Sequence, residues 1–309
     1  MLGASGGTDR GSRPGRADAF VAFDPFLYVA LGAGIAAGRI VRWRSPWVGR
    51  ATRLTIVVLV AFLGTLLDGV PFASLLISGP VALALAVSLL GATAGVYLLL
   101  ARREAGPTPS ARPVGTRERV PFGIVLIATL LAGFALGHFA TLPSSLGITG
   151  ALYVLLALVG FDLKLQWIGL RQLAAPLTSA VAAAAGCAIA FALVSGTAWS
   201  VSFATTFAFG WYTLAGPLVA ARAGTLLGIL AFLTNFFREN LTMVASPYVG
   251  RRLRGPGLAA LGGATSMDTT LYFVTRYGDA DAGSLSLASG LVLTLAAGLL
   301  LPALLALPL

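Results

Sequence analysis

Long apolar runs, separated by short polar segments, make up most of the chain after residue 24. Because the hydrocarbon core of a bilayer is about 30 Å thick, a helix needs roughly 20 apolar residues to cross it. Runs close to that length predict eight transmembrane helices, at 26–41, 54–68, 75–101, 121–142, 147–162, 176–195, 226–246 and 284–307. The pattern therefore predicts an all-α polytopic membrane protein with about eight transmembrane helices.

Two further apolar stretches, 200–222 and 256–277, are interrupted at their centres. Residues 210–217 contain two glycines and a proline, and residues 262–268 read Gly-Gly-Ala-Thr-Ser-Met-Asp. Glycine and proline interrupt regular helical hydrogen bonding, so neither stretch is expected to stay helical from end to end. We expect two broken segments, which either cross the membrane or enter and leave on one face as re-entrant segments.

The positive charges favour the re-entrant arrangement. The chain has 21 lysines and arginines against 11 acidic residues, a net charge of +10. If both broken segments are re-entrant, 16 of the 21 cations share one side of the membrane, and cytoplasmic loops are enriched in such residues. These cations lie at 39–53, 102–119, 164–171, 251–254 and 276. The predicted topology has eight crossings, both termini outside and two re-entrant segments that approach from opposite faces.

The same pattern divides the chain into four parts. A polar tail at 1–24 lacks the apolar core of a signal peptide and is expected to be disordered. Three helices at 25–101 precede a basic cytoplasmic loop at 102–120, and five helices with the two broken segments follow at 121–309. Broken segments that meet near the membrane midplane are typical of inverted-repeat transporters, although no internal sequence repeat is evident here.

Composition narrows the functional class. Hydrophobic residues make up 57% and charged residues 10% of the chain, and the mean hydropathy is +0.90, which excludes a soluble globular protein. The basic charge lies in short loops between apolar runs, so it indicates membrane orientation and not nucleic-acid binding. With a single cysteine, Cys187, and a single histidine, no metal cluster or hydrolytic site is expected. We therefore expect neither an enzyme nor a cofactor.

Four acidic residues on the apolar runs are candidates for function: Asp68, Asp162, Glu239 and Asp268. An ionisable group inside the hydrocarbon costs roughly 2.5–3.5 kcal/mol, so each needs a physical reason. Asp68 and Asp162 end predicted helices, where a solvated interfacial residue is the alternative interpretation. On a helix, Asn235 and Glu239 lie one turn apart, so their polar face is expected to point into the protein. Glu239 is a candidate proton or amine site.

The neighbours of these acids supply the other candidates. Arg238, next to Glu239, either forms a structural ion pair with another helix or belongs to the functional site. Thr265 and Ser266 can cap a half-helix and aim backbone N–H groups at an anion, and Asp268 is either such a cap or a functional carboxylate.

Two aromatic residues, Trp211 and Tyr212, lie in the first break. They are candidates for lining a substrate cavity. The alternative is that they belong to the aromatic belt at the membrane interface.

Three motifs, in their order and spacing, resemble the bacterial lysine exporter family. They are Phe-Gly-Trp-Tyr-Thr-Leu-Ala-Gly at 209–216, Asn-Phe-Phe-Arg-Glu-Asn at 235–240 and Gly-Ala-Thr-Ser-Met-Asp at 263–268. The resemblance implies an eight-crossing inner-membrane exporter of L-lysine and of analogues such as thialysine, with required acids inside the membrane. It assigns such a role to Asp268 and to Asp68, whereas Asp162 departs from the neutral residue expected at its position.

Lysine carries two ammonium groups and one carboxylate, so its site needs both anions and N–H donors. Asp268 with Asp68 or Glu239 suits the amines, and half-helix ends suit the carboxylate. Moving a cation out against an inside-negative potential costs about 2.3 kcal/mol per 100 mV, so export requires coupling, for which proton antiport is the simplest choice. The expected partners are L-lysine, protons and the lipid bilayer. An exporter of another cationic amino acid or small amine, and a cation-selective channel, are the alternatives.

Overall fold

Helices follow one another throughout the described part of the chain. The computed structural model describes residues 26–41, 46–66, 71–103, 122–140, 143–163 and 166–307 and contains no strand within these ranges. Its helices are α1 Phe26–Val41, α2 Pro46–Leu66, α3 Phe72–Arg103, α4 Phe122–Phe139, α5 Ser144–Asp162, α6 Leu170–Ser195, α7 Trp199–Thr206, α8 Tyr212–Ala223, α9 Thr225–Gly262, the 3-10 helix η3 Gly263–Met267, α10 Leu271–Tyr277 and α11 Ala282–Ala306. The predicted tail at 1–24, most of the predicted loop at 102–120 and Asp68 lie outside the described residues.

Each of the eight predicted transmembrane runs lies on one of the helices α1 to α6, α9 and α11. In the described part of the chain, α2, α3, α6 and α11 are long and apolar enough to cross a membrane, and α1, α4 and α5 are shorter apolar helices. Helix α9 is long but carries Asn235, Arg238 and Glu239 near its middle. The all-helical membrane fold is thus confirmed, and the number of crossings stays a prediction.

Two helices begin at least six residues earlier than their hydropathy predicts. Helix α2 starts at Pro46 and not at 54, because its first turns accommodate arginines; the guanidinium of Arg50 lies 5.2 Å from the centre of the Trp47 ring. Helix α6 starts at 170 and not at 176, and the Gln172 side chain accepts a hydrogen bond from the Gly169 N–H at 2.9 Å. Hydropathy places the start of a helix after its last polar residues. The first turns of a helix can nevertheless include such residues, because their side chains reach polar surroundings.

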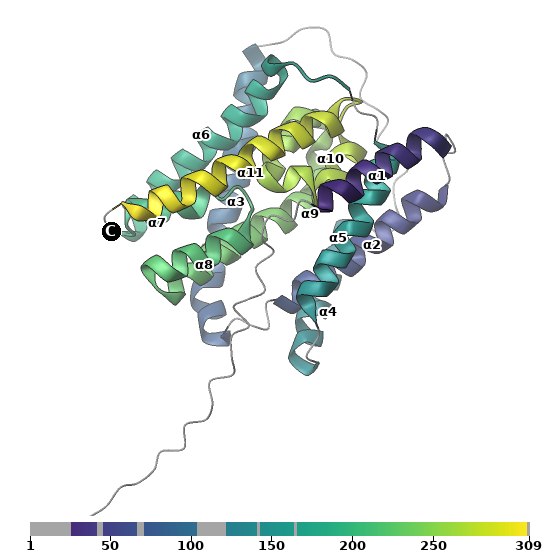
Figure 1. The fold of residues 1–309 in the computed structure, drawn as a ribbon. Helices are drawn as coiled ribbons and strands as arrows, with labels where there is room; N and C mark the ends of the chain where they lie inside the picture. Colours follow the sequence, from purple (N-terminus) through teal and green to yellow (C-terminus); the bar gives the residue numbers. More distant parts are fainter. Residues whose placement is uncertain are drawn as a thin grey trace, which may run out of the picture.

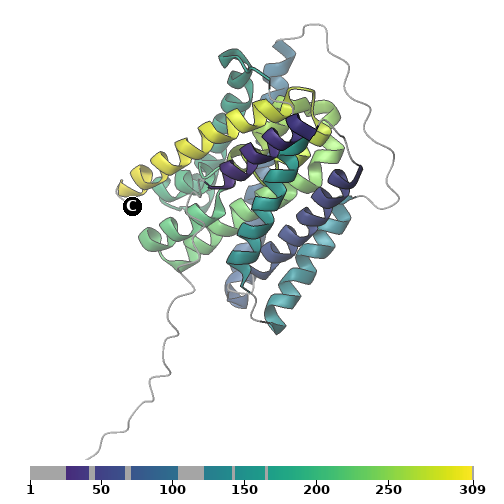
Figure 2. The same cartoon turned by 45° about the vertical axis from the view of Figure 1, so that its right-hand side comes forward.

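Four helices, α1, α2, α4 and α5, form one group, in which α1 packs along α5 and α2 along α4 (Figure 1, Figure 2). Both pairs meet through glycines. A Cβ atom added to Gly34 would lie 2.1 Å from the Ala157 carbonyl oxygen, and one added to Gly133 would lie 2.1 Å from that of Ala61. No side chain fits at such distances, so these glycines allow the backbones of the paired helices to touch.

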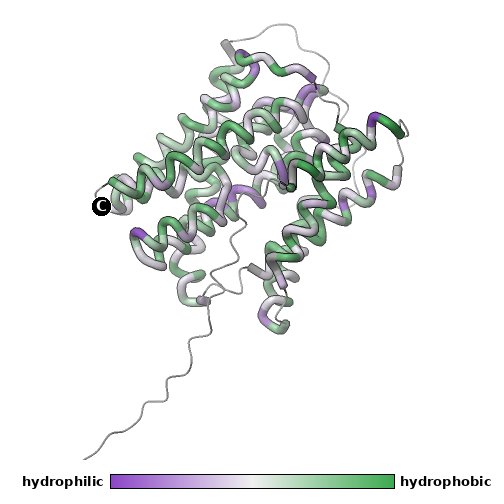
Figure 3. The backbone as a smooth tube through the Cα atoms, viewed as in Figure 1, coloured by the Kyte–Doolittle hydropathy of each residue, from purple (hydrophilic) through white to green (hydrophobic). Residues whose placement is uncertain are grey.

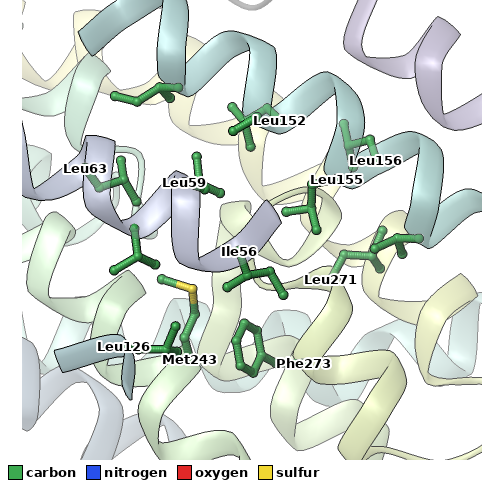
Figure 4. Packing of buried hydrophobic residues seen from close by; sticks show 14 of the residues in the cluster. Ile56, Leu59, Leu63, Leu126, Leu152, Leu155, Leu156, Met243, Leu271 and Phe273 are labelled. Atoms are coloured by element: carbon green, nitrogen blue, oxygen red, sulfur yellow. The ribbon is translucent and has the colours of Figure 1, made fainter. Parts of the chain in front are cut away.

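The remaining helices pack around α9, which contacts α3, α6, α8, α10 and α11. Hydrophobic residues predominate along α6 and α11 at the outside of this second group (Figure 3). The two groups meet through an apolar cluster between α2, α4 and α5 on one side and α9 and α10 on the other (Figure 4). Its labelled members are Ile56, Leu59, Leu63, Leu126, Leu152, Leu155, Leu156, Met243, Leu271 and Phe273.

The second broken segment is a hairpin. Helix α9 kinks at Arg254, whose φ is 52°, and its last turns then run back toward the middle of the bundle before η3 and α10 return. A Cβ atom at Gly278 would lie 3.0 Å from the Gly255 Cα, so the two ends of the hairpin lie side by side. A Cβ atom at Gly255 would lie 2.7 Å from the Ala282 Cβ, which places this end at the start of α11.

The first broken segment, formed by α7, residues 207–211 and α8, ends at the opposite end of α11. The Arg222 side chain, in the last turn of α8, donates from Nε to the Leu305 carbonyl oxygen at 2.9 Å. Helix α6, which leads into α7, begins near the other end of α11, where the Gln166 N–H donates to the Ser284 hydroxyl at 2.8 Å. The two broken segments therefore enter the helix bundle from opposite ends.

The glycine contacts predict a specific loss of stability. Replacing a helical glycine with alanine ordinarily stabilises a helix by about 0.5–1 kcal/mol. At Gly133 the new Cβ would overlap the Ala61 carbonyl oxygen, so we expect Gly133→Ala to destabilise the fold by about 1–3 kcal/mol. The measurement is the thermal unfolding midpoint of the purified protein in detergent. Gly150→Ala is the control, because nothing lies within 4 Å of a Cβ atom there. Equal midpoints for the two variants would contradict the close α2–α4 contact.

Candidate functional site

The two broken segments meet beside the middle of α9. The Ala264 N–H, in the second break, donates a hydrogen bond to the Phe209 carbonyl oxygen in the first break at 3.0 Å. Gly263 has a φ of 64°, and a Cβ atom there would lie 2.5 Å from the same oxygen. Gly210 has a φ of 101°, and its Cβ position is 3.3 Å from Thr265 Cγ2. Glycine is therefore required at this crossing both by the backbone angles and by the close approach.

Asn235 of α9 holds the first break in place. Its Oδ1 accepts a hydrogen bond from the Gly210 N–H at 2.8 Å, and its Nδ2 donates to the carbonyl oxygens of Thr205 at 2.8 Å and Ala231 at 2.9 Å. These bonds satisfy backbone groups that a broken helix frees inside an apolar environment. Three of the roughly four hydrogen bonds that an amide side chain can make are thus used within the protein. A direct contact between Asn235 and a substrate stays a prediction.

Thr265 and Ser266 hold the second break. The Thr265 hydroxyl donates a hydrogen bond to the Gly262 carbonyl oxygen at 3.0 Å, and the Ser266 hydroxyl donates one to the Gly263 carbonyl oxygen at 2.7 Å. The Ser286 hydroxyl, from α11, donates to the Ser266 carbonyl oxygen at 2.7 Å. The alternative in which Thr265, Ser266 or Asp268 caps the following half-helix is not supported, because Thr270 is the residue that precedes α10 and no side chain caps it. Thr265 and Ser266 lie within η3, and Thr269 and Thr270 separate Asp268 from α10.

Glu239 and Asp268 come together at the end of the second break. Glu239 is 1% exposed, and its carboxylate faces Thr269 and Asp268. The Thr269 hydroxyl donates to Asp268 at 3.1 Å, and the Thr269 N–H donates to the same carboxylate oxygen. The Thr269 hydroxyl lies close to the Glu239 carboxylate, but no hydrogen bond of ordinary geometry reaches either oxygen from the described residues. A buried acceptor in this state is ready to receive a proton or a cationic donor.

The first break turns its two aromatic residues in different directions. Tyr212 is buried, with its ring 5.3 Å from that of Phe232 and 5.6 Å from that of Phe236, and it lies within electrostatic reach of both Glu239 and Asp268. Trp211 packs with apolar side chains toward α11. The structure therefore joins Tyr212 to the acidic pair, and a substrate contact for Trp211 stays a prediction.

Arg238 lies on the other side of the second break from the acids. It is 1% exposed, and its Nη2 donates to the Ala260 carbonyl oxygen at 3.3 Å. Within the described ranges it forms no ion pair with Glu239 or with any other carboxylate, so the alternative of a structural ion pair is not supported there. Asp162 is the last residue of α5, and its side chain is not among those described.

Sequence reasoning missed three threonines at the crossing. Thr269 bonds to Asp268, while the hydroxyls of Thr234 and Thr270 are buried without a partner in the described part of the chain. The adjacency of Thr269 and Thr270 to Asp268 in the second break was an available signal. Thr234, one residue before Asn235, has no sequence feature that distinguishes it from other helical threonines.

Comparison with known proteins gives this site a family context. The model of a family described as lysine exporter LysO matches residues 127–305. The chain is 31% identical over 183 residues to the lysine exporter LysO of Escherichia coli (strain K12), which covers 56% of the chain and 59% of that protein. It is 29% identical over 93 residues to a putative lysine exporter of Haemophilus influenzae (strain ATCC 51907 / DSM 11121 / KW20 / Rd), covering 30% of the chain and 47% of that protein. No solved structure matches the chain significantly.

The matched region begins within α4 and extends through α11, so it contains both broken segments and the crossing. The alignments span less than two thirds of the length of either relative, at 59% and 47%. The resemblance found in the three sequence motifs is confirmed by a family model that covers more than half of the chain. The chain belongs to the lysine exporter family.

Proposed function

We propose that the protein exports L-lysine, and analogues such as thialysine, across the cytoplasmic membrane in exchange for protons. The observation that carries this proposal is the acidic pair at the crossing. Glu239 is almost fully buried, no hydrogen bond of ordinary geometry reaches its oxygens from the described residues, and it faces Thr269 and Asp268. A carboxylate in this environment is stabilised either by a proton or by an ammonium group.

Competition between the two cations provides the coupling. Lysine leaves the cell as a cation against an inside-negative potential, which opposes its export by about 2.3 kcal/mol per 100 mV. When a proton replaces lysine on the acidic pair, the site can return without carrying an unpaired negative charge through the protein. Proton entry then drives lysine exit, and neither step leaves the buried acids uncompensated.

The proposed topology has eight crossings, two re-entrant hairpins and both termini outside. Two observations support it: the hairpins enter from opposite ends of the bundle, and 16 of 21 cations fall on one side in this arrangement. Backbone breaks at membrane depth occur where protein buries them, and Asn235 and Ser266 bond to the freed groups here.

Two other functions are the alternatives. Another cationic amino acid or small amine would satisfy the same acidic pair. A cation-selective channel would need a continuous polar path, whereas the backbone hydrogen bond from Ala264 to Phe209 closes the crossing. Saturable counterflow in liposomes distinguishes a carrier from a channel. Only a carrier, whose binding site returns with substrate bound, accumulates labelled lysine in exchange for unlabelled lysine.

The substrate is tested in cells. In a bacterial strain that lacks its own lysine exporter, we expect expression of this protein to lower intracellular lysine and to permit growth on thialysine. Growth and lysine content are measured against an empty vector, with the amount of protein in the membrane fraction verified. Protection no better than that of the vector would count against lysine as the substrate.

The topology is tested by cysteine labelling in a Cys187→Ala background. We expect cysteines placed in 102–120 and 251–254 to react with a membrane-impermeant reagent only from the cytoplasmic side, because these segments carry the clustered arginines. Cysteines at 143–146 are expected to react from outside. Reaction of Arg252→Cys from outside would replace the re-entrant model with one in which the broken segments cross the membrane.

The acidic pair is tested by neutralising each member. Asp268 accepts hydrogen bonds from the Thr269 N–H and hydroxyl, and the Oδ1 of an asparagine can keep both, so we expect Asp268→Asn to fold normally. The variant cannot hold a proton or a cation, and lysine efflux is expected to fall at least tenfold. Glu239→Gln is expected to behave in the same way. Labelled lysine transport into inverted vesicles measures both.

The matched control is Asp281→Asn. Asp281 precedes α11 at the end of the bundle, and its side chain caps no helix. We expect the Asp281→Asn variant to transport lysine at a rate within twofold of the wild-type rate. Normal transport by Asp268→Asn would remove Asp268 from the mechanism and leave Glu239 and Asp68 as the acids to consider.

A further inference from the structure

We infer that the Arg238 guanidinium binds the carboxylate of the exported molecule, so that the protein selects amino acids over diamines. This inference rests on the proposed function. It adds the part of the substrate that the acidic pair does not recognise.

The guanidinium has more donors than the protein uses. Arg238 is 1% exposed, and it makes a single side-chain hydrogen bond, from Nη2 to the Ala260 carbonyl oxygen at 3.3 Å. Among the described residues Nη2 finds only this acceptor, and the buried Nε and Nη1 find none. Leaving charged donors unsatisfied in an apolar interior is unfavourable, so this arrangement calls for an anion. A carboxylate engages a guanidinium with two parallel hydrogen bonds, from Nε with Nη2 or from Nη1 with Nη2, and Nη2 has a second N–H besides the one that reaches Ala260.

The acids of the crossing do not supply that anion. Glu239 follows Arg238 on α9, but its carboxylate faces Thr269 and Asp268 at the far end of the second break. Arg238 contacts the near end of the same break, at Ala260 and Gly263. The break therefore separates a cationic subsite from an anionic one. An amino acid, which carries a carboxylate and at least one ammonium group, has the charges that match both.

Gly263 lies against the Arg238 guanidinium with no side chain between them. A Cβ atom at this position would lie 2.9 Å from both Nη1 and Nη2 of Arg238. Any side chain would press against the terminal nitrogens on the side of the break. The glycine that permits the crossing of the two broken segments thus also keeps side-chain atoms away from the terminal nitrogens.

Charge balance points to the same substrate class. The described ionisable groups at the crossing are one arginine and two acids, Arg238, Glu239 and Asp268, which together carry one negative charge when ionised. Lysine, with a net charge of +1, neutralises this set and pairs each of its members. A diamine such as cadaverine carries +2, leaves the guanidinium unpaired and makes the buried set net positive, which is costly in a low-dielectric interior.

The experiment removes the protein guanidinium and the ligand carboxylate, separately and together, and compares the binding affinities. Binding of labelled lysine to the purified protein in detergent is competed with lysine, lysinamide and cadaverine. We expect the two ligands without a carboxylate to bind roughly 10- to 100-fold more weakly than lysine, the range for hydrogen bonds to charged groups. Arg238→Gln should weaken lysine binding by a similar factor and strengthen cadaverine binding, because the two acids alone then balance the charge of the diamine. A residue that only supports the fold would weaken both ligands equally.

Arg222→Gln is the control, because Arg222 also donates to backbone carbonyl oxygens but lies at the end of α8, away from the crossing. If Arg238→Gln does not fold, Arg238→Lys keeps the charge without the paired donors and should retain a reduced preference for lysine. The wild-type comparison decides by itself: equal affinities for lysine and cadaverine would overturn the carboxylate subsite and leave lysine export standing. Absence of lysine binding to the wild-type protein would instead overturn the proposed function.

Discussion

The contact between the two broken segments is the constraint on which the rest of this structure depends. A peptide chain can leave the helical conformation inside a membrane protein only where other groups satisfy its free N–H and carbonyl groups. Here the breaks satisfy part of this requirement for each other, through the hydrogen bond from Ala264 to Phe209. The approach is so close that Gly263 admits no side chain.

Helix α9 connects the crossing to the rest of the molecule. Within little more than one turn it presents Asn235 to the first break, Arg238 to the start of the second and Glu239 to its end. Its contacts with α3, α6, α8, α10 and α11 hold this polar stripe inside an otherwise apolar bundle. The low hydropathy of α9 is therefore the result of its central position. A helix that faces protein on all sides can carry charges that a lipid-facing helix cannot.

The four-helix group of α1, α2, α4 and α5 has a different physical basis. Its helix pairs come together through glycines such as Gly34 and Gly133, where backbone meets backbone. Toward α9 and α10 it presents leucine and isoleucine side chains, which form the apolar cluster with Met243 and Phe273. Tyr212 belongs to this cluster through its ring while its hydroxyl lies near the acids. The candidate site thus lies beside the contact between the two helical groups.

The sequence by itself determined the helices, the positions of the two breaks and the family. Helix length follows from membrane thickness, and a break follows from local glycine and proline, so both can be read along one dimension of the chain. The spacing of Asn235 and Glu239 likewise placed them on one face of α9. Only the tertiary structure decided that Asn235 bonds to the first break, that Ser266 bonds within the second, and that Arg238 and Glu239 face different ends of it. These outcomes depend on contacts between segments that are distant in sequence, and the packing of whole helices sets them.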